Sequence, residues 1–204
     1  MINYKYLHVL TGSTGFSRIS KKDKQKTSRI KNFQQCIRLK SIRNFSLKAP
    51  KLEVVIELLS SSYGTTSSGV CAVPSAGSIY GLQFYLFVTE SQEIYHFSSS
   101  NQLINLKRGL NPLIYFDQFS GCPIILFIFG HANSYAYYYG IRGYRYMLIE
   151  AGHFAQEFIH HATMKHLGIC PIGAFDDEGL LHSIGIAFTD LLPLYAIAIG
   201  EYHE

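Results

Sequence analysis

The sequence predicts a single α+β domain, and three observations support this fold class. The chain has 204 residues, of which 48% are hydrophobic and 16% charged, as in a globular domain that buries its own core. Several short runs of aromatic and β-branched residues have the length of buried strands, and two other segments carry apolar residues at helical spacing. Neither an internal repeat nor a proline-rich linker divides the chain, so strands and helices are expected to share one core.

The predicted elements follow the chain in a mixed order. A first helix is expected over residues 51–60, with an apolar face formed by Leu52, Val55, Ile56 and Leu59. The longest helix is expected over residues 142–167, and the following Gly168 is a suitable stop. Strands are predicted at residues 82–88, 93–97, 123–129 and 193–199. Residues 63–78 are rich in Gly, Ser and Thr, which predicts a loop.

Positive charge is concentrated at the start of the chain. Residues 1–50 hold twelve Lys or Arg and one acid, whereas residues 51–204 hold six Lys or Arg and thirteen acids. Such an arm could contact a phosphate or an acidic peptide, but it lacks the interleaved aromatic residues of a surface that binds nucleic acid. We therefore expect a basic lead-in over residues 1–38, a folded domain over residues 39–204, and no nucleic-acid partner.

Cysteine usage and hydropathy indicate a cytoplasmic protein. The four cysteines, at positions 36, 71, 122 and 170, form no C-x-x-C pair, which favours a reducing compartment over a disulfide framework or a zinc site. No apolar run approaches the ~18 residues that a membrane helix needs. The first residues lack the charged and apolar segments of a signal peptide. No membrane partner is expected.

Three segments could bind a phosphorylated, flat ligand. Lys40, Ser41 and Arg43 combine two cations with a hydroxyl, which suits a phosphate, although basic residues ahead of a helix are commonly just exposed. Residues 73–80 (VPSAGSIY) and 168–177 (GICPIGAFDD) offer small residues and backbone amides that could approach a ring. An ordinary loop and a connecting turn would explain the same two compositions.

Side chains that could move a proton occur in residues 137–145 (YYYGIRGYR). A tyrosine can act as an acid or a base when nearby cations favour the phenolate, and two arginines follow Tyr138 and Tyr139 closely. Aromatic packing is the alternative. Two Glu-x-x-His pairs, starting at Glu150 and Glu157, fall on one predicted helix, where they would repeat along a face instead of converging on a metal.

In their order and spacing these segments resemble the SagB-type dehydrogenases of thiazole/oxazole-modified microcin biosynthesis. The series runs from KSIRNFS through VPSAGSIYGLQFYLFV, EIYHF, YYYGIRGYRYMLIEAGHFAQE and GICPIGAFDD to PLYAIAIG, from about Lys40 to Gly200. The resemblance implies a nitroreductase-like FMN-binding fold, with a central antiparallel or mixed sheet flanked by helices, in a homodimer that holds FMN at its interface.

The resemblance also implies roles for individual residues. The FMN phosphate would be held by Lys40, Ser41 and Arg43. The isoalloxazine ring would be lined, from the other subunit, by Pro74, Ser75, Ala76 and Gly77. Its backbone contacts would come from Pro171, Ile172 and Gly173. The candidate catalytic residues are Tyr139 and Tyr138, and Tyr138 stands where the family has lysine. Gly81 and Lys40 also depart from the family, which has proline and arginine there.

The implied reaction is the oxidation of thiazoline or oxazoline rings in a precursor peptide to thiazole or oxazole. It needs a hydride acceptor, which FMN supplies, and a base from the protein. A cyclodehydratase or synthetase complex that forms the rings is the expected partner. Two alternatives remain open at this point: a general nitroreductase-like enzyme that uses NAD(P)H, and a non-catalytic subunit that keeps the fold within a peptide-modifying complex.

Overall fold

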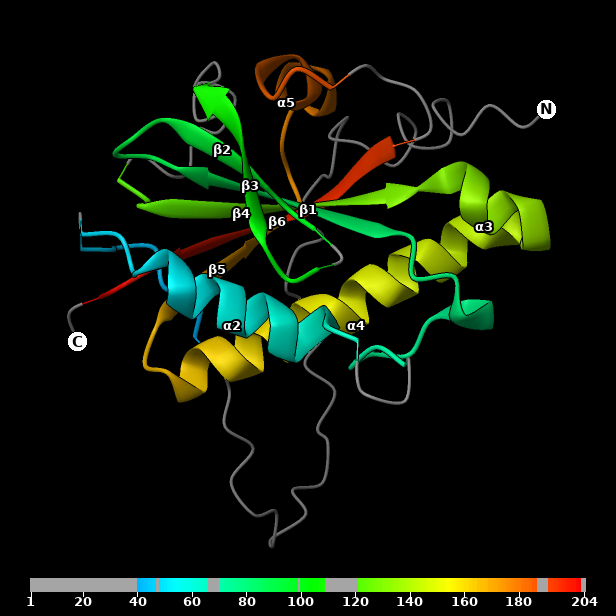
Figure 1. Ribbon diagram of the computed structural model, residues 1–204, viewed down its shortest axis with the longest axis horizontal. Helices are drawn as coiled ribbons and strands as arrows, with labels where there is room; N and C mark the ends of the chain where they lie inside the picture. The colour runs from blue at the N-terminus through cyan, green and yellow to red at the C-terminus, as the bar shows by residue number, and fades with distance from the viewer. Residues whose placement is uncertain are drawn as a thin grey trace, which may run out of the picture.

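The described residues form one six-stranded antiparallel sheet, in the order β3-β2-β1-β4-β6-β5, with helices on both faces (Figure 1). The computed structural model describes residues 40–46, 48–65, 70–98, 100–108, 121–186 and 191–202. The predicted basic lead-in, residues 1–38, and Cys36 lie outside this part of the chain.

The strands are β1 (Leu82–Val88), β2 (Glu93–Phe97), β3 (Leu103–Arg108), β4 (Ile124–His131), β5 (Gly168–Ile172) and β6 (Leu191–Gly200). The helices are α2 (Leu52–Tyr63), η1 (Ala76–Ser78), α3 (Ala132–Tyr139), α4 (Arg142–Met164) and α5 (Asp177–Ser183).

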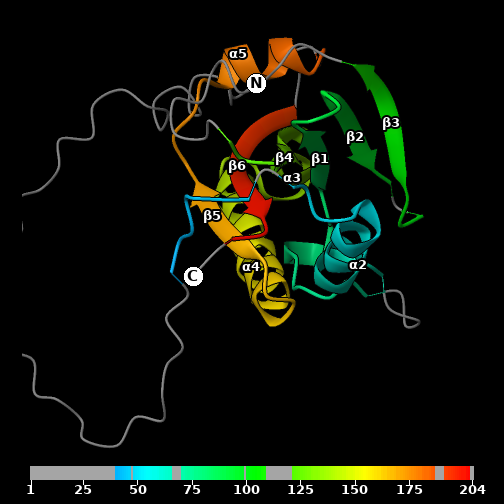
Figure 2. The same ribbon diagram turned by 90° about the vertical axis from the view of Figure 1, so that its left-hand side faces the viewer.

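Strand β4 lies in the middle of the sheet and is covered on both faces. Helices α2 and α4 pack on one face and α5 lies over the other (Figure 2). Because both faces are covered, β4 is apolar along its length instead of alternating, and all its residues except His131 are buried. The α+β class with an antiparallel sheet is therefore confirmed. No helix in the described ranges is long and apolar enough to cross a membrane.

Helix α2 confirms the first predicted helix and half of its predicted buried face. The fully buried positions are Val55, Leu58, Leu59 and Ser62, whereas the predicted Leu52 and Ile56 are only half-buried. Residues 54–59 are apolar except for Glu57, so the sequence leaves the rotation of the helix open. Packing against α4 and the sheet selects the face.

The segment around Gly168 corrects two predictions. Helix α4 ends at Met164, and the residue that adopts the left-handed conformation after it is His166 (φ 57°), not Gly168. Gly168 instead begins β5, so the alternative of a connecting turn does not hold for residues 168–172. A Cβ at Gly168 would lie 2.9 Å from Tyr202 and 3.0 Å from Ile42, so this glycine permits a close approach of neighbouring segments.

Strand β6 is longer than predicted and contains a proline. Its pairing with β4 shifts register between Ile128 and Phe129, which face Tyr195 and Pro193, so that Leu194 is skipped. Proline has no N–H to donate to a sheet, and a bulge is where an interior strand tolerates it. Strand β3 and helices α3 and α5 were not predicted as elements.

One buried carboxylate joins three helices and the start of β1. Glu150 of α4 is 1% exposed, and it accepts hydrogen bonds from the hydroxyls of Tyr63 in α2 (2.6 Å) and Tyr135 in α3 (2.8 Å). Burial, and next the Glu150 charge, raise the pKa of both Tyr63 and Tyr135 far above the usual range. Both phenols therefore keep their protons in the folded protein at high pH.

This arrangement predicts a loss of stability in alkali. Below pH 10.0, the ordinary tyrosine pKa, both phenols are protonated in the folded and unfolded states, and their contribution is complete. Above it the unfolded chain loses protons that the folded protein retains, so the free energy of unfolding falls by about 1.4 kcal/mol per pH unit for each tyrosine. Urea unfolding from about pH 9 to about pH 12 measures this slope. The double variant Tyr63→Phe/Tyr135→Phe should show a shallower decline; an equal slope would contradict the assignment.

Candidate functional site

Residues 40–46 lie along the outer edge of β5. The amide of Ile42 donates to the carbonyl of Ile169 (2.9 Å), and the amide of Ser46 donates to the carbonyl of Glu201 (2.7 Å). These bonds bring the predicted phosphate-binding segment, which precedes β5 by more than a hundred residues, alongside Pro171. Two of the three predicted ligand-binding segments therefore meet at this edge of the sheet.

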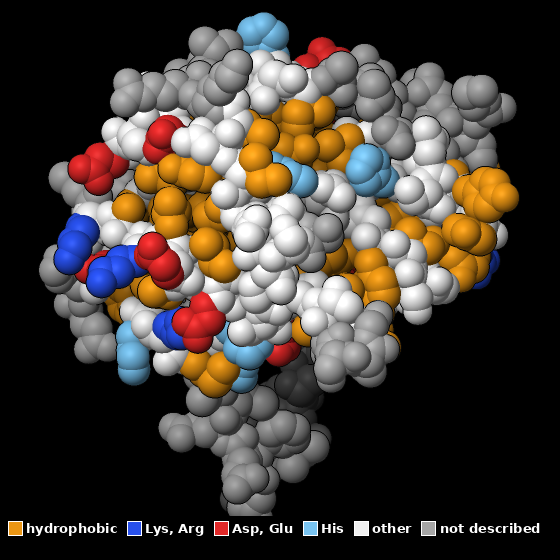
Figure 3. All heavy atoms as spheres, viewed as in Figure 1, with side chains coloured by type: hydrophobic (Ala, Val, Ile, Leu, Met, Phe, Trp, Pro, Cys, Tyr) orange, Lys and Arg blue, Asp and Glu red, His pale blue; other side chains and the backbone are white. Residues whose placement is uncertain are grey.

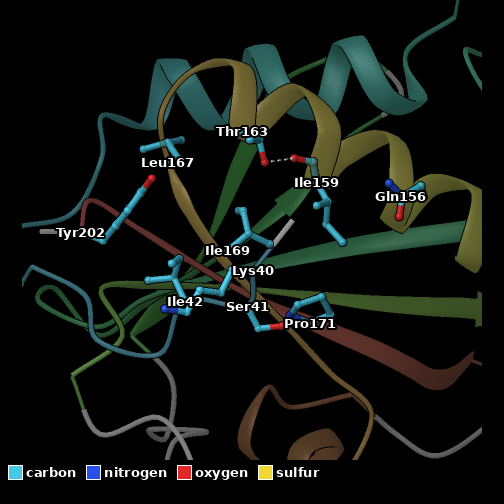
Figure 4. A pocket seen from close by; sticks show the side chains of 10 residues that line it. All are labelled: Lys40, Ser41, Ile42, Gln156, Ile159, Thr163, Leu167, Ile169, Pro171 and Tyr202. Carbon is cyan, nitrogen blue, oxygen red and sulfur yellow. Dashed lines mark hydrogen bonds between the residues drawn. The ribbon is translucent and has the colours of Figure 1, made fainter. Parts of the chain in front are cut away.

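A hollow of about 530 Å³ opens where these segments meet α4 (Figure 4). Its walls are formed by Lys40, Ser41, Ile42, Gln156, Ile159, Thr163, Leu167, Ile169, Pro171 and Tyr202. In Figure 4 the side chain of Ser41 points toward Pro171, and the α4 residues form the opposite wall. Charged and polar side chains thus share the hollow with an apolar floor, which suits a ligand that has both a charged group and a flat apolar part.

Arg43 does not line the hollow. It is exposed, and its guanidinium acts instead on Cys170 of β5. Burial raises the pKa of the Cys170 thiol, and the positive charge of Arg43 lowers it in part. The structure therefore brings Lys40 and Ser41 to the wall of the hollow, whereas the charge of Arg43 acts on Cys170.

The second predicted segment forms η1 and packs against the tyrosines. Gly77 has a φ of 60°, and a Cβ added to it would lie 2.7 Å from the hydroxyl oxygen of Tyr139. The Nδ1 atom of His153 lies 3.4 Å from the carbonyl oxygen of Pro74. Glycine at position 77 is thus required both by its conformation and by the close approach of Tyr139. The candidate ring-lining loop and the candidate catalytic tyrosine are neighbours.

The three consecutive tyrosines differ in exposure. Tyr137 is 84% exposed, Tyr138 69% and Tyr139 37%. The rings of Tyr137 and Tyr138 lie 4.9 Å apart, and those of Tyr139 and Tyr146 also 4.9 Å. Figure 3 shows hydrophobic side chains gathered at the α3 end of the molecule, whereas charged side chains gather over α2. Of the two candidate catalytic residues, Tyr138 faces outward and Tyr139 contacts the η1 loop.

The ring-lining loop and the hollow occupy different stretches of α4. The loop contacts His153, while the hollow is lined by residues from Gln156 onward. Figure 1 shows η1 beside α3 and β5 farther along α4. Ile172 is buried in the core beneath α5, so its backbone alone is available to a ligand, whereas Gly173 is exposed and has room around it.

The structure also adds residues to the site. Gln156, Thr163 and Tyr202 line the hollow, and Glu150 accepts a hydrogen bond from Tyr135, whose oxygen accepts one from the Gly81 amide that follows η1. Glu150 and Glu157 do not act together: Glu150 points into the core, and Glu157 pairs with His161 at 3.0 Å. In the part of the chain that is described, no three His, Cys, Asp or Glu side chains come together as metal ligands.

Solved structures share this fold. One chain of the Escherichia coli microcin synthetase McbBCD complex with truncated pro-MccB17 bound is similar with a TM-score of 0.82 and 18% identity, over 98% of this chain and 92% of that one. A candidate nitroreductase from Ralstonia eutropha gives a TM-score of 0.72 and 18% identity, over 81% and 80%. A third, from Exiguobacterium sibiricum in complex with FMN, gives 0.58 and 13%, over 81% and 85%.

Sequence comparison agrees with the fold. A candidate nitroreductase of Methanocaldococcus jannaschii is 29% identical over 168 residues, which cover 76% of this chain and 85% of that protein. Residues 39–201, most of the chain, match the Nitroreductase family. The six-stranded sheet, the hollow at its edge and this match together show that the chain belongs to the nitroreductase family of flavin-dependent oxidoreductases.

Proposed function

We propose that this protein is an FMN-dependent dehydrogenase that oxidises thiazoline or oxazoline rings to thiazoles or oxazoles in a ribosomally made, bacteriocin-like peptide. The observation that carries the proposal is the placement of the motifs that resemble azoline dehydrogenases. They form two surfaces on this fold, a hollow lined by Lys40, Ser41 and Pro171 and a loop in which Gly77 contacts Tyr139. The flavin domain would comprise residues 39–204, with residues 1–38 as its lead-in.

The residues present suit FMN. Lys40 and Ser41 offer a cation and a hydroxyl for its phosphate, with Arg43 nearby on the same segment. Pro171 and the exposed backbone of Gly173 offer an open strand end for the ring, and Gly77 leaves no side chain in the way. When bound, FMN would supply the acceptor for a hydride.

The protein's own task is to remove a proton. Aromatisation of an azoline takes two hydrogens from adjacent ring carbons, one as a hydride and one as a proton, while the bond between those carbons becomes double. Tyr139 is the candidate base, because it is partly exposed and touches the loop that would line the ring. Tyr138 lies beside it, with ring centroids 6.5 Å apart, on the outer side.

A homodimer would complete the site. The resemblance to azoline dehydrogenases implies that the hollow of one chain and the η1 loop of the other would enclose one ring. Helix α4 exposes Leu148 (40%) and Ile149 (46%) in the turn before His153, which supplies apolar surface for such a contact. The precursor peptide and a ring-forming cyclodehydratase or synthetase complex are the proposed partners. The similarity to a chain of a microcin synthetase complex supports that proposal.

A general nitroreductase activity is the second candidate, with NAD(P)H as the electron donor. The relative at 29% identity, itself a candidate nitroreductase, favours it. A third possibility is a scaffold subunit that binds no flavin. Yellow FMN retained through purification separates either enzyme from the scaffold. Oxidation of an azoline peptide, against reduction of a nitroaromatic compound by NAD(P)H, separates the two enzymes.

The phosphate assignment is tested by removing each cation. Loss of a charge-assisted hydrogen bond costs about 1.5–3 kcal/mol, so Lys40→Ala and Arg43→Ala should each weaken FMN binding about ten- to a hundred-fold. Lys48→Ala is the control, because Lys48 is an exposed lysine that lines a separate hollow beside Glu90 and Cys122. Flavin fluorescence titration gives the dissociation constants. Equal dissociation constants for FMN in all three variants would contradict the assignment of Lys40 and Arg43 to the phosphate.

The shared site is tested by the mass of the particle in solution. Light scattering should report a dimer that carries FMN. Ile149→Arg on α4 should give a monomer with reduced flavin content, because a charge in an apolar contact is costly. Ile104→Arg on β3 is matched in exposure, at 48% against 46%, and should leave the dimer intact. A monomer that retains full FMN would reject the shared site.

The role of Tyr139 is tested by removing one oxygen. A general base contributes about 10²–10⁴ in rate, so Tyr139→Phe should slow azoline oxidation by that factor with the flavin content unchanged. Tyr137→Phe, an exposed tyrosine of the same helix, serves as the control. Mass spectrometry of a cyclised peptide would follow the loss of about 2 Da per ring, which two departing hydrogens require. Tyr138→Lys should keep or raise activity. Full activity of Tyr139→Phe would make Tyr139 a packing residue.

A further inference from the structure

The loop that would line the flavin ring has an unusual backbone. Gly77, Ser78 and Tyr80 have φ values of 60°, 54° and 49°. Ser78 and Tyr80 carry side chains, and residues with side chains are rare in the left-handed region unless their surroundings fix them there. Specific interactions must therefore hold residues 75–81 in this conformation.

Hydrogen bonds at the end of the loop stabilise this conformation. The amide of Tyr80 donates to the Ser75 hydroxyl (3.0 Å). The next two amides, of Gly81 and Leu82, donate to the phenol oxygens of Tyr135 (3.1 Å) and Tyr63 (3.2 Å). Two successive backbone amides where β1 begins thus donate to side chains of α3 and α2.

Both phenols are aimed by Glu150. Each phenol has a single proton, and each donates it to one oxygen of this buried carboxylate, so that its lone pairs face the backbone amides. If the carboxylate were removed, the phenols would lose the acceptor that fixes their direction. The conformation of the loop is in this way coupled to a buried side chain of α4 that is not among the residues lining the hollow.

The two phenols differ in what they reach. Tyr135 acts on the loop itself: the Ser75 hydroxyl hydrogen-bonds to it and lowers its pKa in part, and a Cβ at Gly81 would lie 2.6 Å from its ring. The Tyr63 hydroxyl reaches Leu82, the first residue of β1, whereas the Tyr63 ring packs edge-on against Tyr80 of the loop, with centroids 6.2 Å apart. One carboxylate therefore has two chemically alike partners, of which one holds the loop and the other holds the strand.

We propose that Glu150 is a positioning residue: through the Tyr135 hydroxyl it holds the Ser75–Gly81 loop in the conformation that would face the flavin. The link between carboxylate and loop stands on the contacts above. The consequence for FMN rests on the proposed function. Tyr63→Phe provides an internal control, because it removes a hydrogen bond to the same carboxylate and keeps the ring that contacts Tyr80 of the loop.

The test compares Tyr135→Phe with Tyr63→Phe in flavin-free protein. Loss of one hydrogen bond shifts a local opening equilibrium by about fivefold or more, so hydrogen exchange of the Tyr80 and Gly81 amides should accelerate by that factor in Tyr135→Phe and stay near the parent in Tyr63→Phe. Glu150→Gln should resemble Tyr135→Phe. If a core variant fails to fold, Ser75→Ala breaks the same link from the loop side and should also accelerate exchange.

The flavin-loaded protein gives the second readout. Tyr135→Phe and Ser75→Ala should weaken FMN binding by about fivefold or more, by the same hydrogen-bond energy, and shift its visible absorption band, whereas Tyr63→Phe should do neither. Unchanged exchange in Tyr135→Phe and Ser75→Ala, equal exchange in the two Tyr→Phe variants, or accelerated exchange with unaltered flavin binding would overturn the proposal. A parent that binds no FMN, while exchange still separates the variants, would reject the proposed function and leave the link between Glu150 and the loop standing.

Discussion

The hydrogen bonds of Glu150 give the molecule a directional constraint that its apolar core cannot supply. Apolar packing is non-directional, so α2, α3 and α4 could slide or rotate on the sheet at little cost. Two phenols point at one buried carboxylate, and they accept the backbone amides of Gly81 and Leu82 where β1 begins, which fixes the helices relative to the strand. A buried polar group that is fully satisfied in this way specifies one arrangement among many of similar hydrophobic energy.

The sequence predicts the central elements well because burial on both faces leaves a clear signal. Strands β1 and β4 are nearly continuous apolar runs, and α4 has a long helical periodicity. Strand β5 is not among the predicted strands, because Gly168 and Pro171 usually mark a turn. At the edge of the sheet neither residue disrupts the pairing, since β5 bonds to β6 on one side. Strand β3 (LINLKR) has too mixed a composition to stand out.

The site could be predicted only in part, because its geometry depends on long-range contacts. The pairing of Lys40 and Ser41 with Pro171 is set by one backbone bond between Ile42 and Ile169. That bond involves no side chain and leaves no trace in composition. Glu150 was recognised only as half of a Glu-x-x-His pair, and its partner Tyr63 lies 87 residues away. The two residues of that pair separate, Glu150 into the core and His153 toward the Pro74 carbonyl.

The segment at residues 40–46 serves two purposes at once. It brings Lys40 and Ser41 to the hollow, and it also shields the outer edge of β5, whose unpaired backbone groups would otherwise be open to another strand. A substitution that displaces residues 40–46 would therefore affect both ligand binding and the tendency of the protein to aggregate. Selection for solubility alone would preserve the backbone geometry of this segment, even in a related protein that no longer binds the ligand. The presence of the segment is therefore weak evidence for catalysis.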